Sequence, residues 1–310
     1  MSKNSDATAA VKPKVYSKGR RIWRDNRIGW GFLLPFMVLF LVFTIIPVFV
    51  AMGYSFTNYN MIQSPSFVGL QNYRNLFLED DVFIIALQNT LVFACVIGPT
   101  GYIMSFLMAW FISLCKRGRG PLALAFYAPS LTSGTAMSVI WLVIFSGDRY
   151  GYLNHLLIRI GLISDPILWG KDSRYILWVV VIISAWMSMG TGFLVFLAGL
   201  QNLDPELYEA GKVDGIKNPF QQLWYITLPL MKPQLLFGAI NSIVSSLAVF
   251  DVATAVAGFP SPNYAAHTIV AHLYDYAFTR FSMGYASAMF LFVFTFGLSR
   301  ICMRIFRSDD

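Results

Sequence analysis

The stretch IGWGFLLPFMVLFLVFTIIPVFVAMGYSF, residues 28–56, decides the fold class because it contains no Asp, Glu, Lys or Arg. A helix of about 20 apolar residues is long enough to cross the hydrocarbon core of a bilayer, and a charge at its centre would be costly. Pro35 and Pro47 would break a soluble helix, but membrane helices tolerate proline because neighbouring groups satisfy the freed carbonyls. The run is also longer than the apolar core of a cleaved signal peptide, about 7 to 15 residues. We therefore expect a kinked helix that anchors the chain in a membrane.

The composition of the whole chain agrees with a membrane protein. Of its 310 residues, 56% are hydrophobic and 13% are charged, whereas a soluble domain carries about 25% charged residues. The net charge of +7 is spread over segments that flank apolar runs, whereas a nucleic-acid-binding protein clusters its basic residues on a folded surface. We therefore expect an all-α integral membrane protein that binds no nucleic acid.

Charge-free stretches recur along the chain and predict about six membrane spans. Their predicted bounds are residues 28–56, 85–114, 122–145, 175–200, 234–257 and 283–305. Residues 28–305 would then form one six-span domain, because the connecting segments on the outer side are too short to fold as a separate domain.

The basic residues predict the orientation of these spans. With the N-terminus placed inside, 17 of the 23 Lys and Arg residues fall on the inner side and 6 on the outer side, and cytoplasmic loops carry an excess of Lys and Arg. We expect both termini in the cytoplasm, with residues 1–27 as a basic segment and residues 306–310 as a tail. The alternative for the basic segment is an arm that binds nucleic acid or anionic lipid.

The predicted cytoplasmic segment 201–233, between the fourth and fifth spans, is long enough to fold by itself. Asp204-Pro205 has the sequence of a helix cap followed by a first helical residue, and Asn218-Pro219 repeats this signal. Gly215, between the two, is a natural helix stop. We expect a compact pair of short helices.

This pair of helices carries a specific resemblance. The run Glu209-Ala210-Gly211, followed by Gly215 and then by Ile226-Thr227-Leu228-Pro229, is similar to the EAA loop in the permease subunits of binding-protein-dependent ABC importers. Gly211 departs from the family pattern, which has a second Ala there, and this change loosens a helix by about 1 kcal/mol without adding bulk. Without the resemblance, the segment would be an ordinary pair of capped surface helices.

Phe67–Tyr73, Lys212–Gly215 and Phe250-Asp251 are similar to the carbohydrate-uptake branch of that family. The resemblance covers about residues 28–307 and implies a multi-pass protein of a prokaryotic cytoplasmic membrane that takes up a sugar, in particular an oligosaccharide. It implies four kinds of protein or lipid partner: a second permease subunit, two ATPase subunits, an extracytoplasmic solute-binding protein and membrane lipid. It also implies that segment 201–233 couples the permease to an ATPase subunit, through Glu209, Ala210, Gly211, Asp214, Gly215, Ile226, Leu228 and Pro229.

Several chemical activities are not indicated by the sequence. No G-x-x-x-x-G-K-[ST] motif occurs, so we expect a transport subunit that is not an enzyme and has no cofactor, with ATP and Mg²⁺ bound by the partner ATPase subunits. The three cysteines show no metal-ligand spacing. His267 and His272 have a spacing that a metal site could use, but we expect them, like His155, to be solvated loop residues.

Polar side chains within predicted spans mark a candidate translocation pathway, because they are costly unless they face protein or water. Three hydroxyls of the fourth span recur at helical spacing, and an Asn and three Ser form a similar stripe in the fifth. The alternative is helix packing, since small hydroxyl residues allow close helix approach and can bond to their own backbone. The candidate pathway residues are Ser184, Trp186, Ser188, Thr191, Asn241, Ser242, Ser245 and Phe250.

Asp251 is the only acidic residue that falls inside a predicted span. An ion-coupled transporter would use such a group as a proton or cation site. Its place near the predicted outer end of the fifth span favours a structural carboxylate that is solvated or hydrogen-bonded. The runner-up function for the chain is accordingly a six-span secondary transporter or channel driven by an ion gradient.

Overall fold

The computed structural model describes residues 18–115, 117–132, 134–293 and 295, and within them the side chains from Gly29 onward except that of Thr191. The chain divides into two compact units, Met1–Gly53 and Tyr54–Asp310, and each is described by itself. The predicted all-α class is confirmed, because helices make up most of the described chain and the two strands are two residues long.

The first unit is one long, bent helical rod. It consists of α1 (Lys18–Phe40), a π-helical turn η1 (Leu41–Ile45) and α2 (Ile46–Tyr54). The π turn ends at Ile45, two residues before Pro47, which has no N–H to donate to the preceding turn. Residues 29–54 of this rod are long and apolar enough to span a membrane.

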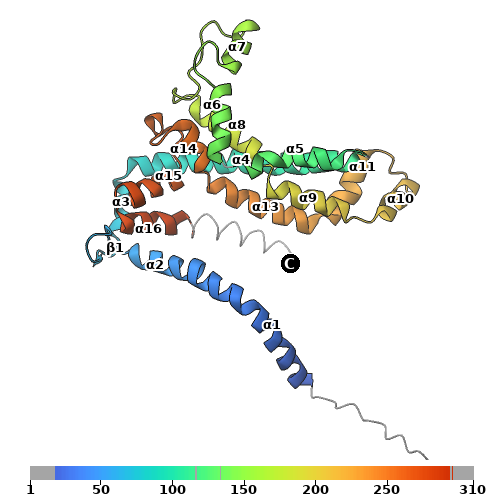
Figure 1. Ribbon diagram of the computed structural model, residues 1–310, viewed down its shortest axis with the longest axis horizontal. Helices are drawn as coiled ribbons and strands as arrows, with labels where there is room; N and C mark the ends of the chain where they lie inside the picture. The colour runs from blue at the N-terminus through green and yellow to red at the C-terminus, as the bar shows by residue number, and fades with distance from the viewer. Residues whose placement is uncertain (1–17, 116, 133, 294, 296–310) are drawn as a thin grey trace, which may run out of the picture. The chain divides into compact units, whose positions relative to one another are not determined.

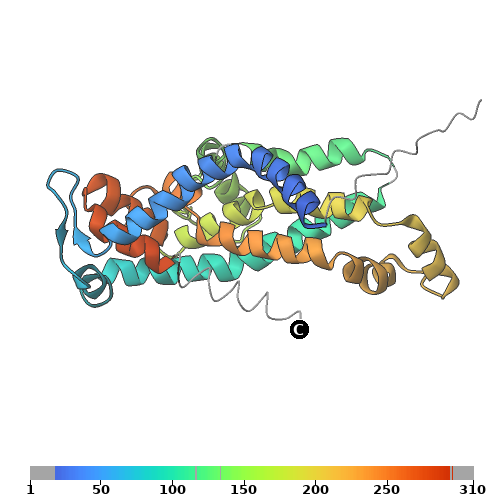
Figure 2. The ribbon, with the colours of Figure 1, turned by 90° about the horizontal axis from the view of Figure 1, so that it is seen from below.

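The second unit is organised around α4 (Asp81–Leu114), the teal helix that runs along its length (Figures 1 and 2). The helices α8 (Ile176–Met187), α9 (Thr191–Gln201) and α13 (Lys232–Leu247) pack against it. Gly101 of α4 permits a close approach, because a Cβ there would overlap the side chain of Ser188.

Three predicted spans are interrupted within the second unit. The third predicted span, 122–145, consists of α5 (Arg119–Leu131) and α6 (Gly134–Ile144), which are bent by 99°. The fourth breaks between α8 and α9 at residues 188–190, and the fifth between α13 and α14 (Asp251–Ala257) at residues 248–250. The predicted stripe of the fourth span is therefore interrupted between Ser188 and Thr191, whereas the stripe of the fifth span lies within α13.

The number of spans remains a prediction. Four helices of the described chain are long and apolar enough to cross a membrane, 29–54, 81–114, 176–201 and 232–257, and the bent pair can supply a fifth. The sixth predicted span, 283–305, begins with the shorter apolar helix α16 (Met283–Phe292), and residues 296–305 lie outside the described residues.

The two ends of the second unit differ in structure (Figures 1 and 2). One end carries the short antiparallel pair β1 (Thr57–Asn58) and β2 (Ser66–Phe67), with α3, α15, the π turn η4 and α16. The other end carries α10 and α11. The bounds of the remaining helices are α3 Gln71–Leu78, α7 Tyr152–Arg159, α10 Pro205–Val213, α11 Pro219–Gln222, η2 Leu223–Thr227, α12 Leu228–Leu230, η3 Pro262–Tyr264, α15 Ile269–Tyr274 and η4 Asp275–Thr279.

Three apolar clusters form the core of this unit. The first joins α8 and α14 around Ile183 and Val256, the second joins α4 and α9 around Phe106 and Phe196, and the third lies between α3, α4 and α16 around Phe83. The cavity described next lies where the first two clusters adjoin, because it is lined by Ile97 of the first and Phe196 of the second.

Candidate functional site

A cavity of about 320 Å³ lies where the three broken helices meet. Its wall includes residues from all three breaks. These are Ser130, Thr132 and Gly134 at the first, Ser188 at the second, and Ala248, Val249 and Phe250 at the third. Irregular backbone at membrane depth is tolerated only where it is buried in protein or lines a water-filled cavity. The cavity therefore accounts for the three helix breaks, and the breaks in turn form part of its wall.

Hydroxyl groups dominate the polar lining of this cavity. The Ser242 Oγ donates to the Gly98 carbonyl of α4 at 2.7 Å, and Ser188 and Ser245 donate to carbonyls of their own helices at 2.6 Å. Ser184 is buried, and its Oγ has no hydrogen-bond partner among the described residues. The seryl groups therefore serve helix packing and line the cavity at the same time, with oxygen lone pairs left over for a ligand.

Six of the eight predicted pathway residues line this cavity: Ser184, Ser188, Asn241, Ser242, Ser245 and Phe250. Trp186 is not among its lining residues and instead packs edge-to-face against Trp141, with ring centroids 5.3 Å apart. Thr191 is the first residue of α9, and its side chain lies outside the described residues.

Sequence reasoning missed several lining residues: Ser105, Ser130, Thr132 and Asp251. Ser246 belonged to the predicted stripe of the fifth span, although not to the candidate residues, and it also lines the cavity. Ser130 and Thr132 of the third predicted span are two residues apart, so they would not share a face of a continuous helix. Both line the cavity in the structure, where the chain bends by 99° after Leu131. Asp251 was expected to be a solvated or hydrogen-bonded structural carboxylate. It is exposed, it stands on the wall of the cavity, and its carboxylate has no hydrogen bond or ion pair among the described residues.

The second candidate element is the pair α10 and α11, and both predicted caps are confirmed. The Asp204 side chain accepts a hydrogen bond from the Glu206 N–H, and Asn218 forms a reciprocal capping box with Gln221. The end of α10 is a Schellman motif, in which Gly215 has φ +93° and the Ile216 N–H donates to the Gly211 carbonyl at 2.8 Å. The element is thus stiffened at each helix end.

The two halves of the predicted coupling motif touch each other. Gly211 is buried, and a Cβ added to it would lie 2.6 Å from the Ile226 Cδ1. The hydroxyls of Tyr208 and Thr227 are hydrogen-bonded at 3.0 Å, which ties α10 to the π turn η2. Gly211 therefore allows close packing inside the loop.

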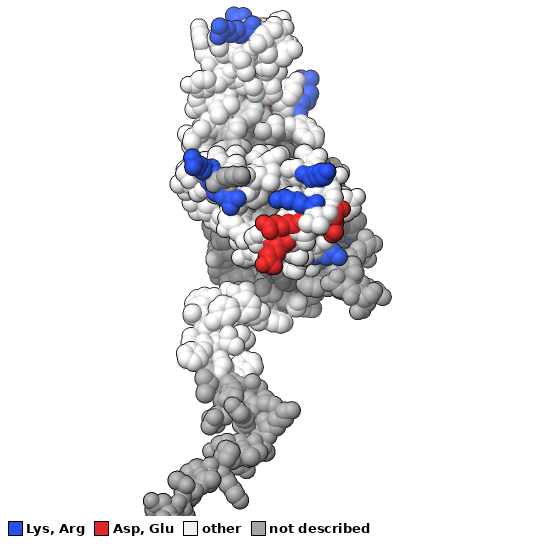
Figure 3. Space-filling model, turned by 90° about the vertical axis from the view of Figure 1, so that its right-hand side faces the viewer, with Lys and Arg blue, Asp and Glu red and all other residues white. Residues whose placement is uncertain are grey.

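Other residues of the motif face outward. Glu209, Ala210 and Pro229 are exposed, and Ile226 and Leu228 are half-buried. Seen from this end of the unit, acidic side chains gather in one patch with basic side chains beside it (Figure 3). The four acidic residues of the loop, Asp204, Glu206, Glu209 and Asp214, are all exposed, so the loop offers carboxylates to a partner surface.

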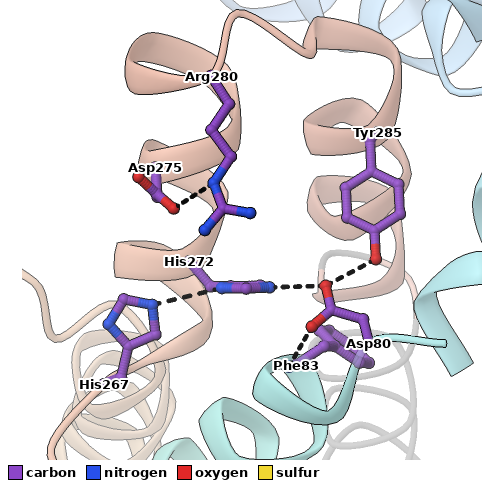
Figure 4. A network of polar contacts seen from close by, with 7 residues as sticks. All are labelled: Asp80, Phe83, His267, His272, Asp275, Arg280 and Tyr285. Carbon is purple, nitrogen blue, oxygen red and sulfur yellow. Dashed lines mark hydrogen bonds and ion pairs between the residues drawn. The ribbon is translucent and has the colours of Figure 1, made fainter. Parts of the chain in front are cut away.

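A third polar site lies at the opposite end of the unit (Figure 4). The His272 Nε2 lies 2.9 Å from the Asp80 Oδ2, and its Nδ1 lies 3.3 Å from the His267 Nε2. The Tyr285 hydroxyl donates to the same Asp80 oxygen at 2.8 Å. This chain of contacts joins the start of α4 to α15 and α16.

Both histidines of this network are buried, with exposed fractions of 3% for His267 and 1% for His272. The expectation that they are solvated was wrong, because Asp80 supplies a polar partner that is 192 residues away in the sequence. His155 is exposed, as expected. Both ring nitrogens of His272 are engaged, so its role here is to connect helices.

The network has shifted pKa values. Burial is the main cause that lowers the pKa of His267 to about 4, and the neighbouring His272 acts in the same direction. For Asp80, burial raises the pKa, but hydrogen bonds from His272, Tyr285 and the Phe83 N–H outweigh it and bring the pKa to about 2. Asp275 is paired with Arg280 at 2.8 Å and lies beside the network.

These shifts predict a loss of stability in mild acid. The buried His267 favours its neutral form, so its stabilisation is present above the ordinary pKa of 6.5 and is lost as the pH falls toward 4. The Asp80 contribution is lost only below pH 3.8.

We expect protonation of His267 to lower the free energy of unfolding by about 1 to 2 kcal/mol between pH 7 and pH 5. His267→Gln should reduce the fall in thermal midpoint over this range, whereas His155→Gln should leave it unchanged; equal falls in both variants would contradict this role.

The comparisons with known proteins agree with this architecture. A family model described as the inner membrane component of binding-protein-dependent transport systems matches residues 24–307. The probable ABC transporter permease protein YesP of Bacillus subtilis (strain 168) is 33% identical over 276 residues, which cover 88% of this chain and 87% of the relative. The lactose transport system permease protein LacF of Rhizobium radiobacter is 32% identical over 266 residues, 84% of this chain and 87% of the relative.

A solved structure has the same fold. It is the crystal structure of a bacterial ABC transporter involved in the import of the acidic polysaccharide alginate, and one of its chains matches with a TM-score of 0.77. The match covers 94% of this chain and 100% of the other at 23% sequence identity. At this identity the likeness establishes the arrangement of helices and leaves the substrate open.

Proposed function

The chain belongs to the family of inner membrane components of binding-protein-dependent transport systems, and from this premise we propose that it is a transmembrane subunit of an ABC importer for a sugar, with the cavity at the three helix breaks as part of the translocation pathway. The observation that carries this proposal is the hydroxyl-rich lining of that cavity, which includes the unpartnered Oγ of Ser184. Hydroxyl and carboxamide groups offer both donors and acceptors to the hydroxyls of a sugar.

Three further observations support a sugar, in particular an oligosaccharide. The name of the relative from Rhizobium radiobacter specifies lactose, a disaccharide. The cavity volume of about 320 Å³ lies at the lower end of the range of small-molecule sites, about 300 to 1,000 Å³. Phe250 adds an aromatic surface beside the hydroxyls.

We place the energy supply in other subunits. In this proposal, α10 and α11 dock on one of two ATPase subunits, which bind ATP and Mg²⁺, and their closure reaches the spans because the capped loop moves as a rigid body. Its exposed residues Glu209, Ala210, Asp214 and Pro229 are the candidate contacts. The buried contact of Gly211 with Ile226, the turn at Gly215 and the half-buried Leu228 hold the loop in shape.

The remaining partners follow from the same premise. A second permease subunit completes the transmembrane part, and an extracytoplasmic solute-binding protein delivers the sugar to the face opposite α10. The chain then lies in the cytoplasmic membrane of a prokaryote, surrounded by lipid, with both termini in the cytoplasm. In the six-span prediction, the excess of Lys and Arg on the side of segment 201–233 supports this orientation.

Substitutions in the cavity test the pathway. Ser245 lines the cavity and is exposed, so Ser245→Leu fills sugar-accessible space without disturbing a buried contact. We expect it to lower sugar uptake by at least about tenfold, because a bulky apolar group replaces a hydroxyl and blocks the path. Val244→Leu, on the exposed side of the same helix and outside the cavity lining, is the matched control. Normal uptake in Ser245→Leu, at equal membrane levels, would remove the cavity from the pathway.

A further inference from the structure

The described lining of the cavity contains a single charged side chain. Among the described residues that line it, Asp251 is the only Asp, Glu, Lys, Arg or His, and the other polar groups are hydroxyls and the carboxamide of Asn241. No hydrogen bond or ion pair within the described chain engages the Asp251 carboxylate. Its negative charge is therefore directed at whatever occupies the cavity.

The position of Asp251 also explains how this charge is stabilised. Asp251 is the first residue of α14, and it lies beside Gly134, the first residue of α6. A Cβ at Gly134 would lie 3.1 Å from the Asp251 Cβ and 3.9 Å from its Oδ2. The start of a helix is its positive end and attracts anions. The carboxylate thus occupies the place at which the start of α6 would otherwise favour an anionic ligand.

A second group in the cavity indicates what the ligand must offer. The buried Oγ of Ser184 has no partner among the described residues, so a ligand hydroxyl would satisfy it. A carboxylate accepts hydrogen bonds from two donors at once, which suits neighbouring hydroxyls of a sugar. A ligand carboxylate or phosphate would instead face a like charge across a cavity without a basic residue in its described lining.

We propose that Asp251 is a specificity-determining residue that makes the cavity accept uncharged sugars and exclude uronates and sugar phosphates. This inference rests on the proposed function, because it assumes that the cavity is the sugar pathway.

The charge of the cavity can be measured without transport. In the complete importer, with the three native cysteines replaced by alanine, Ser245→Cys places a thiol in the lining. The test compares its reaction rates with a cationic methanethiosulfonate, the trimethylammonioethyl compound, and an anionic one, the sulfonatoethyl compound. We expect the cation to react faster, and Asp251→Asn to lower the ratio of cationic to anionic rates by at least about tenfold, since a local charge changes encounter rates by such factors.

Two controls make this result specific. Asp251→Glu should keep the ratio within about twofold, because it keeps the charge. Asp165→Asn removes an exposed carboxylate outside the cavity lining and should also leave the ratio unchanged. If Asp251→Asn had no effect on the ratio, the proposal would be overturned. Asn241→Cys provides a second reporter position if Ser245→Cys does not assemble.

Sugars then test the substrate class on the same reporter thiol. Lactose and lactobionate are a neutral and an anionic disaccharide derivative of similar size. Lactose at millimolar concentration should slow the reaction of the thiol with uncharged methyl methanethiosulfonate, lactobionate should not, and Asp251→Asn should allow both to protect. Equal protection by both sugars with Asp251 in place would overturn the proposal. Protection by neither, with the charge preference intact, would support the role of Asp251 and contradict the disaccharide assignment in the proposed function.

Discussion

Gly211→Val is expected to uncouple the importer while leaving the chain inserted in the membrane. Gly211 is buried against the Ile226 side chain, and even a single added carbon would approach the Ile226 Cδ1 to 2.6 Å. A branched side chain there must push α10 away from η2 and strain the contact between Tyr208 and Thr227. Overpacking of this kind costs about 1 to 3 kcal/mol, which is enough to displace an element whose function is rigid docking.

The measurement is ATP hydrolysis by the purified complex with and without loaded binding protein. We expect the stimulation by binding protein to fall by at least about tenfold in Gly211→Val, the factor that corresponds to about 1.4 kcal/mol. Gly211→Ala is the matched control and should be mild, because the Ile226 Cδ1 is the end of a flexible side chain and can move aside. Adding Ile226→Ala to Gly211→Val should restore the stimulation by binding protein, since it removes the atom that clashes. Full stimulation in Gly211→Val alone would show that the packing of α10 on η2 has no part in coupling.

Segment 201–233 was the most predictable part of the chain, because short sequence patterns specify the ends of its helices. Asp204, Asn218 and Gly215 act through hydrogen bonds and backbone angles within a few residues of themselves, so their roles can be deduced from short sequence patterns. The contact between Gly211 and Ile226 could not be deduced in this way. It depends on how α10 folds back onto η2, which no periodicity specifies.

Two of the three helix breaks were missed for a related reason. The break after Leu131 occurs at hydroxyl residues, and the one at residues 248–250 reads Ala-Val-Phe, without Pro or Gly. Such residues do not by themselves end a helix, and neighbouring helices must supply partners for the freed backbone groups. The apolar composition therefore predicted the spans, whereas the cavity that their breaks create, with Asp251 in its wall, required the packed structure.

The buried histidine network shows the same limit at longer range. His267 and His272 lie in a segment between predicted spans, where solvated histidines are expected. Their burial depends on Asp80, which caps α4 and lies 192 residues from His272 in the chain. A sequence pattern that spans a few residues cannot report such a pairing.

The orientation of the chain in the membrane can be tested with an all-or-none result. Tyr150 and Val213 are both 88% exposed, so cysteines at these two positions should react with a maleimide equally well wherever the reagent can reach them. Asn154, near Tyr150 in the chain, would be a poor choice, because its buried side chain accepts from the Ile167 N–H and the Trp169 indole and donates to three carbonyls. Because Tyr150 and Val213 are equally exposed, a difference in their reaction with the maleimide reports on which side of the membrane each position lies.

In the six-span prediction, 17 Lys and Arg residues fall on the side of segment 201–233 and 6 on the other side, which predicts that the side of α10 is cytoplasmic. In a background without native cysteines, Tyr150→Cys should react with a membrane-impermeant maleimide in right-side-out vesicles, and Val213→Cys only in inverted vesicles. Washing the inverted vesicles with urea removes bound ATPase subunits, so that a protected Val213→Cys is not mistaken for an inaccessible one. Reaction of Val213→Cys in right-side-out vesicles would place α10 outside, where no ATPase could reach it, and the proposed coupling of this loop to ATP hydrolysis would fail with the orientation.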